Sequence, residues 1–127
     1  PAVSPILLGV ILALAQKYKI VLGVAVDGHS CNGGFHPKGM AIDINGVTSM
    51  DGSQKTSDGR HINPSDYSSN NPILLSFYND AGKLLDQSGG GGLGQYFSWG
   101  TPPPKVSSKV NYFDDAPNHL HMDVGRR

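Results

Sequence analysis

Two short segments contain residues of the types and spacing that a catalytic zinc site needs. His36 and Asp43 begin and end one of them, and His119 and His121 stand two positions apart in the other. Catalytic zinc takes three protein ligands, usually His nitrogens and a carboxylate oxygen, and keeps a fourth position for water. Residues i and i+2 of a strand share a face. The spacing therefore predicts a zinc hydrolase in which one of the two later histidines binds metal and the other handles protons.

Each motif alone is a weak signal, because a lone histidine or a His–Asp pair is usually an ordinary polar contact. Both motifs occur here in a chain of 127 residues, and each lies in a segment that alternates polar and apolar side chains, Met40–Ile44 and His119–Val124. Such alternation is typical of a strand with one buried face. We therefore expect a metal site in a cleft on a sheet.

The segment Gly28–Ile44 resembles the S-x-H-x-x-G-x-A-x-D region of the LAS metallopeptidases. That group includes D-Ala-D-Ala carboxypeptidases and dipeptidases, lysostaphin-type endopeptidases, phage endolysin peptidases and the hedgehog signalling domain. The similarity is nearest to the D-Ala-D-Ala peptidase branch. The matching positions are His36, Gly39, Ala41, Asp43 and the terminal motif Asn118-His-Leu-His121.

This resemblance implies the residues of the site and its chemistry. The zinc ligands would be His36, Asp43 and His121, and His119 would be a catalytic neighbour. The implied activity is zinc-dependent hydrolysis of an amide bond in the peptides of bacterial peptidoglycan. The implied setting is the bacterial cell wall, reached by secretion or phage delivery, with the chain acting as a monomer or as a module of a larger lysin.

The sequence departs from the family pattern at two positions. Many members carry an acidic general base three residues before the last ligand, where this chain has Asn118, so that role passes to His119 or to Asp115. The family also often has an arginine in the turn before the first ligand, and here His29 is expected to take its place. The missing arginine favours an endopeptidase over a D,D-carboxypeptidase, which binds a free C-terminal carboxylate.

Two other functions stay open from the sequence. A non-catalytic zinc-binding module of the hedgehog kind is consistent with the loss of an acidic residue at Asn118. A cysteine peptidase would use Cys31 as nucleophile, with His119 or His121 as base. That alternative leaves the His36–Asp43 motif unexplained. A zinc assay separates the cysteine peptidase from the other two functions, and turnover of peptidoglycan separates the zinc peptidase from the module.

The composition fits a single domain, residues 1–127, with one modest core. Ten acidic and ten basic side chains give a formal charge of zero. This balance argues against nucleic acid as the main partner, because phosphate binding needs a concentrated basic surface. The apolar segment 5–16 lacks a basic start and is too short to span a bilayer. It is interpreted as a buried helix, and no membrane insertion is expected.

The first half of the chain predicts one helix and two strands. Ser4 and Pro5 can begin a helix that runs to about Lys19, whose charge suits the helix end. The β-branched run 20–26 predicts a central strand, and 40–44 predicts a second strand that carries Asp43. The polar stretch 45–70 is interpreted as a long loop, either a wall of the cleft or a surface excursion.

The second half predicts another helix and three short strands. Apolar residues recur at helical spacing after Asn71, at Leu74, Phe77, Tyr78, Ala81 and Leu85. This helix should stop before the glycines at 89–92, interpreted as a flexible turn. Strands are predicted at 95–99, 109–113 and 119–124. The expected fold class is α+β, with a small, mainly antiparallel sheet, two flanking helices and long polar loops.

Several further side chains are predicted to support the site. Tyr96 and Trp99 are candidates for a second wall of the cleft, since flat apolar side chains line peptide clefts well. Asp123 and Ser30 are candidates for orienting the metal ligands through hydrogen bonds.

Overall fold

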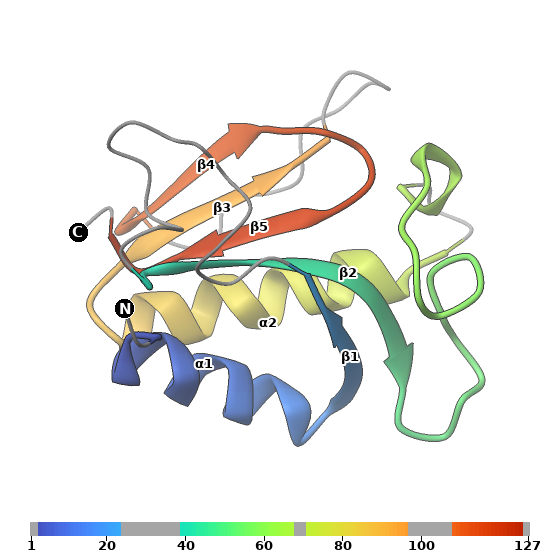
Figure 1. Cartoon of the computed structure of the whole chain (residues 1–127), viewed down its shortest axis with the longest axis horizontal. Coiled ribbons are helices and arrows are strands. Elements are labelled where there is room, and N and C mark those ends of the chain that lie inside the picture. The colour runs from blue at the N-terminus through green and yellow to red at the C-terminus, as the bar shows by residue number, and fades with distance from the viewer. Residues whose placement is uncertain (1–2, 24–38, 68–70, 97–107, 126–127) are drawn as a thin grey trace.

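The computed structural model describes residues 3–23, 39–67, 71–96 and 108–125, which form a five-stranded sheet with two α-helices against it (Figure 1). The order of the strands is β1-β2-β5-β3-β4. Their bounds are β1 Tyr18–Leu22, β2 Ala41–Ser49, β3 Gly91–Gln95, β4 Val110–Asp114 and β5 Leu120–Asp123. Neighbours pair antiparallel, apart from the parallel pair β3–β4. The expected α+β class and mainly antiparallel sheet are confirmed.

Helices α1 (Pro5–Ala15) and α2 (Ile73–Gln87) lie on the same side of the sheet (Figure 1). The predicted apolar stripe of α2 is confirmed, because all five of its residues are buried in the core. The helix also ends before the glycine run, as expected. Within the described residues, neither helix has the length and apolar character to cross a membrane.

Helix α1 starts as predicted but ends earlier. The Ser4 hydroxyl accepts hydrogen bonds from the backbone N–H groups of Ile6 and Leu7, and Pro5 occupies the first turn. The predicted end at Lys19 is wrong, because Tyr18 already belongs to β1 and pairs with Ser49. Its buried ring packs edge-on against α2, and its hydroxyl lies 2.6 Å from Asp80 Oδ2. This tertiary contact overrides helix propensity.

The outer face of α1 differs from the expected buried helix. Ile6, Leu8 and Leu12 are 44–62% exposed, so only the face towards α2 and the sheet is buried. Strand β1 also differs from the prediction, since it lies at the edge of the sheet and pairs only with β2. The central positions are taken by strands that carry candidate site residues.

The segment after β2 is more ordered than a loop. β2 extends to Ser49, because its second half pairs with β1. A short 3-10 turn follows at Pro64–Asp66. The buried Asp66 carboxylate accepts hydrogen bonds from Ser57, from the backbone N–H of Asn63 and from the Asn71 amide. The buried carboxylate therefore ties the turns at Ser57 and Asn63 to each other and to Asn71, just before α2.

The glycine run is a turn followed by a strand, not a flexible turn throughout. Gly89 and Gly90 have φ angles of 106° and 110°, which favour glycine. Gly91 then begins β3, where a Cβ atom would collide with the backbone carbonyl of Asp123 in β5. The strand therefore needs glycine for close approach of two backbones.

Candidate active site

Asp43 and His121 lie opposite each other on the neighbouring strands β2 and β5. The register pairs Asp43 of β2 with His121 of β5. Their neighbours Ile42, Ile44 and Leu120 belong to the core under the sheet. Because successive side chains of a strand point to opposite faces, Asp43 and His121 lie on the face away from the helices. The predicted placement on two strands follows from this alternation.

Two histidine nitrogens converge on one oxygen of Asp43. Asp43 Oδ1 lies 3.7 Å from His121 Nδ1 and 3.8 Å from His119 Nε2. Donors that share a tetrahedral zinc ion, each about 2 Å from it, are roughly 3.3 Å apart. The spacing of Asp43 and His121 is therefore close to that of two ligands of one ion.

Asp123 fixes the orientation of the His121 ring. Its Oδ2 atom lies 2.8 Å from His121 Nε2, and the carboxylate is fully buried. This contact leaves Nδ1 directed to Asp43. A carboxylate behind a ligating histidine sets the tautomer and raises the basicity of the metal-binding nitrogen. The structure thus places Asp123 against the ring of His121, and the role of that histidine as a metal ligand stays a prediction.

His119 is held by the turn before β5. Its Nδ1 lies 2.8 Å from Asn118 Oδ1, and its Nε2 lies 3.5 Å from Asp115 Oδ2. The hydrogen bond to Asp115 raises the pKa of His119 against the opposing effect of burial. Burial alone would raise the pKa of Asp115, but the hydrogen bond and charge of His119 lower it. The chain between Asp115 and His119 therefore places the Asp115 carboxylate beside His119 Nε2.

Several predicted site residues lie outside the described residues. They are His29, Ser30, Cys31, His36 and Trp99. Within the described part of the chain, no cluster of three or more His, Cys, Asp or Glu side chains forms a metal site. The described donors are thus two of the three predicted ligands, and the assignment of His36 stays a prediction.

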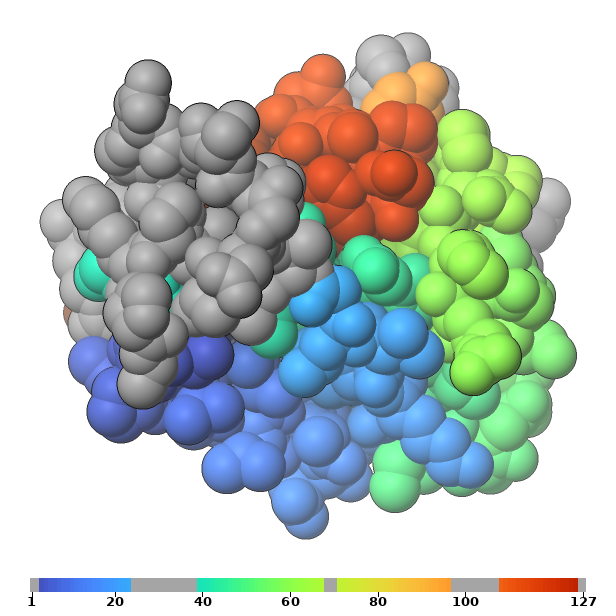
Figure 2. All heavy atoms as spheres, in the orientation of Figure 1, coloured from blue at the N-terminus to red at the C-terminus, as the bar shows by residue number. Residues whose placement is uncertain are grey.

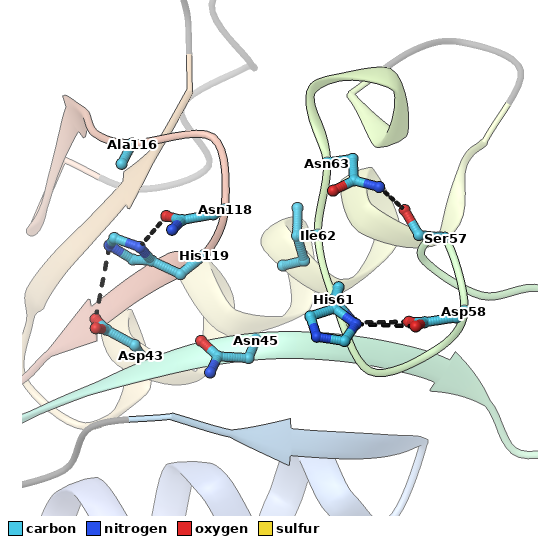
Figure 3. Close-up of a pocket in the computed structure, with 10 residues that line it drawn as sticks. All are labelled: Asp43, Asn45, Ser57, Asp58, His61, Ile62, Asn63, Ala116, Asn118 and His119. Atoms are coloured by element: carbon cyan, nitrogen blue, oxygen red, sulfur yellow. Dashed lines mark hydrogen bonds and ion pairs between the residues drawn. The ribbon is translucent and has the colours of Figure 1, made fainter.

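A cavity of about 860 Å³ opens beside Asp43 and His119 (Figure 3). One side, the strand wall, contains Asp43, Asn118 and His119. The opposite side, the loop wall, contains Ser57, Asp58, His61 and Asn63, with Asn45 between the two (Figure 3). In the space-filling view, the green segment that carries the loop wall and the red C-terminal segment occupy the same face (Figure 2). Within the described residues, part of the polar stretch 45–70 therefore lines the cavity, namely Asn45, Ser57, Asp58 and His61–Asn63.

Of the two residues predicted for a second wall of the cleft, Trp99 lies outside the described residues and only Tyr96 can be placed. Tyr96 packs edge-on against Tyr67, with ring centroids 5.8 Å apart, and is not among the described residues that line the cavity. The Tyr67 hydroxyl donates a hydrogen bond to the backbone carbonyl of His119 at 3.3 Å. These tyrosines support the site from behind instead of forming its surface.

Sequence reasoning missed Gly94 and Phe113. Gly94 of β3 pairs with His121, and a Cβ atom there would collide with the Phe113 ring. That ring packs edge-on against His121, with centroids 5.3 Å apart. A glycine inside a strand is the available signal, since it often marks close packing of another group.

Gly94→Ala is expected to destabilise the protein by about 1–3 kcal/mol and to lower its Tm by about 3–10 °C. The added methyl group would displace Phe113 and approach the carboxylate of Asp115. Thermal unfolding and the NMR signals of the His121 imidazole would measure both effects. Gly9→Ala is the matched control, because a Cβ at Gly9 in α1 meets nothing within 4 Å and should stabilise the helix. Wild-type Tm and imidazole signals in Gly94→Ala would contradict the packing argument.

The metal-free protein is expected to lose stability between about pH 6.5 and 9. Burial alone would lower the pKa of His121, but hydrogen bonds to Asp123 and Asp43 raise it to about 9. A group whose pKa is raised on folding stabilises the fold below its unfolded pKa, and this contribution is lost as pH rises through the folded value. The loss is on the order of 3 kcal/mol at most. Tm measured with chelator across this range should fall, and His121→Asn should flatten the curve. An equally steep curve in His121→Asn would contradict this origin.

The chain matches no protein-family model, and comparison with curated proteins and with solved structures gives no match either. The interpretation of the site therefore rests on its geometry and on the sequence motifs.

Proposed function

We propose that this chain is a zinc-dependent peptidase that hydrolyses an amide bond in bacterial peptidoglycan peptides, with an endopeptidase favoured. The observation that carries the proposal is the convergence of His121 Nδ1 and His119 Nε2 on Asp43 Oδ1, because Asp43 and His119 also line a large cavity. The activity would take place at the bacterial cell wall, with the protein secreted or delivered by a phage.

The donor set suits zinc. Asp43 offers a carboxylate oxygen, and His121 offers an imidazole nitrogen whose ring is fixed from behind by Asp123. These two residues and His36 would hold the ion. When bound, zinc polarises a substrate carbonyl and lowers the pKa of its water to about 7.

His119 would move protons at its Nε2 atom. Asn118 accepts a hydrogen bond from Nδ1–H of His119, which leaves Nε2 directed into the site beside Asp115. From this position His119 can take a proton and return it to the leaving amine. The Asp115 carboxylate, whose pKa is lowered, would stabilise the protonated imidazole. His29 would hold a substrate carbonyl in place of the family's arginine.

A non-catalytic zinc-binding module is the second candidate. The observation in its favour is Asn118, which stands where the family's acidic base is expected and only accepts a hydrogen bond from His119. The peptidase and the non-catalytic module would have the same metal site, so zinc binding alone does not separate these two functions.

Purified sacculi incubated with zinc-loaded protein test the proposal. We expect release of cross-link fragments with new amines and no new reducing sugars, measured by mass spectrometry, and no release after chelation. Release of free D-Ala alone would identify a carboxypeptidase. No release from several wall chemistries, with zinc occupancy confirmed, would support the non-catalytic module.

A further inference from the structure

We propose that His61, held by Asp58, binds a backbone N–H of the substrate peptide on the wall of the cavity opposite His119. This inference rests on the proposed function, because it assigns a peptide to the cavity. It makes His61 a positioning residue of the same site and not a participant in the bond cleavage.

The His61–Asp58 pair is built into a tight turn. Asp58 Oδ1 accepts hydrogen bonds from the backbone N–H groups of Arg60 at 2.8 Å and His61 at 3.0 Å. Asp58 Oδ2 lies 2.9 Å from His61 Nδ1. The backbone hydrogen bond from Arg60, followed by the contact with His61, lowers the pKa of Asp58 to about 2. Asp58 is therefore a carboxylate at neutral pH and accepts the Nδ1 proton of the imidazole.

This arrangement selects one tautomer of His61. With the proton of this tautomer on Nδ1, Nε2 is the ring nitrogen that can accept a hydrogen bond. Figure 3 shows the ring directed into the space between the two walls, with Asp58 behind it and Asn45 beside it. The side chain is 73% exposed, so its contact with Asp58 contributes little to the stability of the fold. The contact with Asp58 thus orients the ring so that Nε2 can accept a hydrogen bond from a molecule in the cavity.

The surrounding side chains favour a peptide as that occupant. Asn45 and Asn63 carry amides, which can both donate and accept hydrogen bonds. A peptide backbone offers N–H and C=O groups in alternation, so it can pair with amides and with an imidazole acceptor. The strand wall would hold the scissile bond, and the loop wall would hold a neighbouring part of the peptide.

The first test uses soluble cross-linked muropeptides, prepared from sacculi with a muramidase. His61→Ala should raise KM for their cleavage about five- to tenfold, as expected for one lost hydrogen bond, with kcat changed less than about twofold. In His61→Ala, the Kd for muropeptide binding, measured on protein from which a chelator has removed the metal, should rise by the same factor. His61→Gln, whose amide oxygen can replace Nε2 as acceptor, should recover most of the loss.

The second test inverts the tautomer without removing the ring. In Asp58→Asn, the amide oxygen can keep both backbone hydrogen bonds while the amide nitrogen donates to His61 Nδ1. The imidazole proton then moves to Nε2, which nitrogen-15 NMR of the ring would show. Nε2 then carries a proton and faces the backbone N–H of the peptide, which is also a donor. No hydrogen bond can form, so Kd and KM should rise as in His61→Ala.

Asp51→Asn is the matched control. Asp51 accepts hydrogen bonds from Ser53 and Ser49 in a neighbouring turn, has a similarly lowered pKa and does not line this cavity. Its substitution removes the same charge from the same segment and should leave Kd and KM unchanged.

The outcomes separate the two proposals. If wild-type protein binds muropeptides but does not cleave them, the peptidase fails and the Kd values still decide the role of His61. Wild-type Kd in both His61→Ala and Asp58→Asn would overturn the inference while leaving the peptidase in place. A fall in kcat with unchanged KM would also overturn it, and absence of any binding would overturn both.

Discussion

His121→Ala is expected to lose most of its bound zinc, with a fall in affinity of more than about a hundredfold. The substitution removes one of the two described metal-binding candidates, His121 and Asp43, that face each other at the site. Substituting only a residue that orients a metal ligand already lowers metal affinity about 10–100-fold, so removing the ligand itself should cost more. Asp123, which is fully buried, loses the imidazole at 2.8 Å in the same step. The zinc-to-protein ratio after dialysis measures the effect, with circular dichroism to confirm that the variant is folded.

Two variants serve as comparisons for this result. Asp123→Asn keeps the ligand but weakens its orientation, so zinc affinity should fall about 10–100-fold. Cys31→Ala should keep both metal and activity. Full zinc occupancy in His121→Ala would contradict the ligand assignment. Activity that is abolished in Cys31→Ala but unaffected by a chelator would identify a cysteine peptidase instead.

The faces of the two central strands could be predicted, but their pairing could not. Alternation in 40–44 and 119–124 indicates which residues share a face, because the period of a strand is two. The alignment of Asp43 with His121 depends on which strands become neighbours, and no local pattern encodes it. The helix α2 was the easiest element to predict, since its long apolar stripe has no competing interpretation.

The errors share a physical cause, which is contact between distant segments. Tyr18 ends α1 early because its hydroxyl and ring bind residues of α2. Gly91 and Gly94 appear suited to a turn, yet they belong to a strand that other groups approach closely. The sequence gives no signal for the His61–Asp58 pair, because its segment has the composition of an ordinary polar loop. Only the fold shows that this segment faces His119 across a cavity.

His119→Ala is expected to retain zinc while losing at least about a hundredfold in kcat, the usual contribution of a general acid or base. The structure gives this residue a different environment from His121. His119 lies before β5, is oriented by Asn118, and its Nε2 lies closer to Asp115 than to Asp43. Zinc content and the rate of muropeptide cleavage, measured on the same preparation, separate metal binding from proton transfer.

Asp115→Asn is the companion to this variant. If Asp115 only stabilises the imidazolium form of His119, Asp115→Asn should be less severely impaired than His119→Ala, since an amide can still form a hydrogen bond at that position. An inactive Asp115→Asn beside an active His119→Ala would make the carboxylate the general base and the histidine its neighbour. Loss of zinc from His119→Ala would show that Nε2 is a ligand, which the 3.8 Å separation from Asp43 Oδ1 also permits. Either result would reassign the roles of His119 and Asp115 without moving the site, because the two side chains lie 3.5 Å apart beside Asp43.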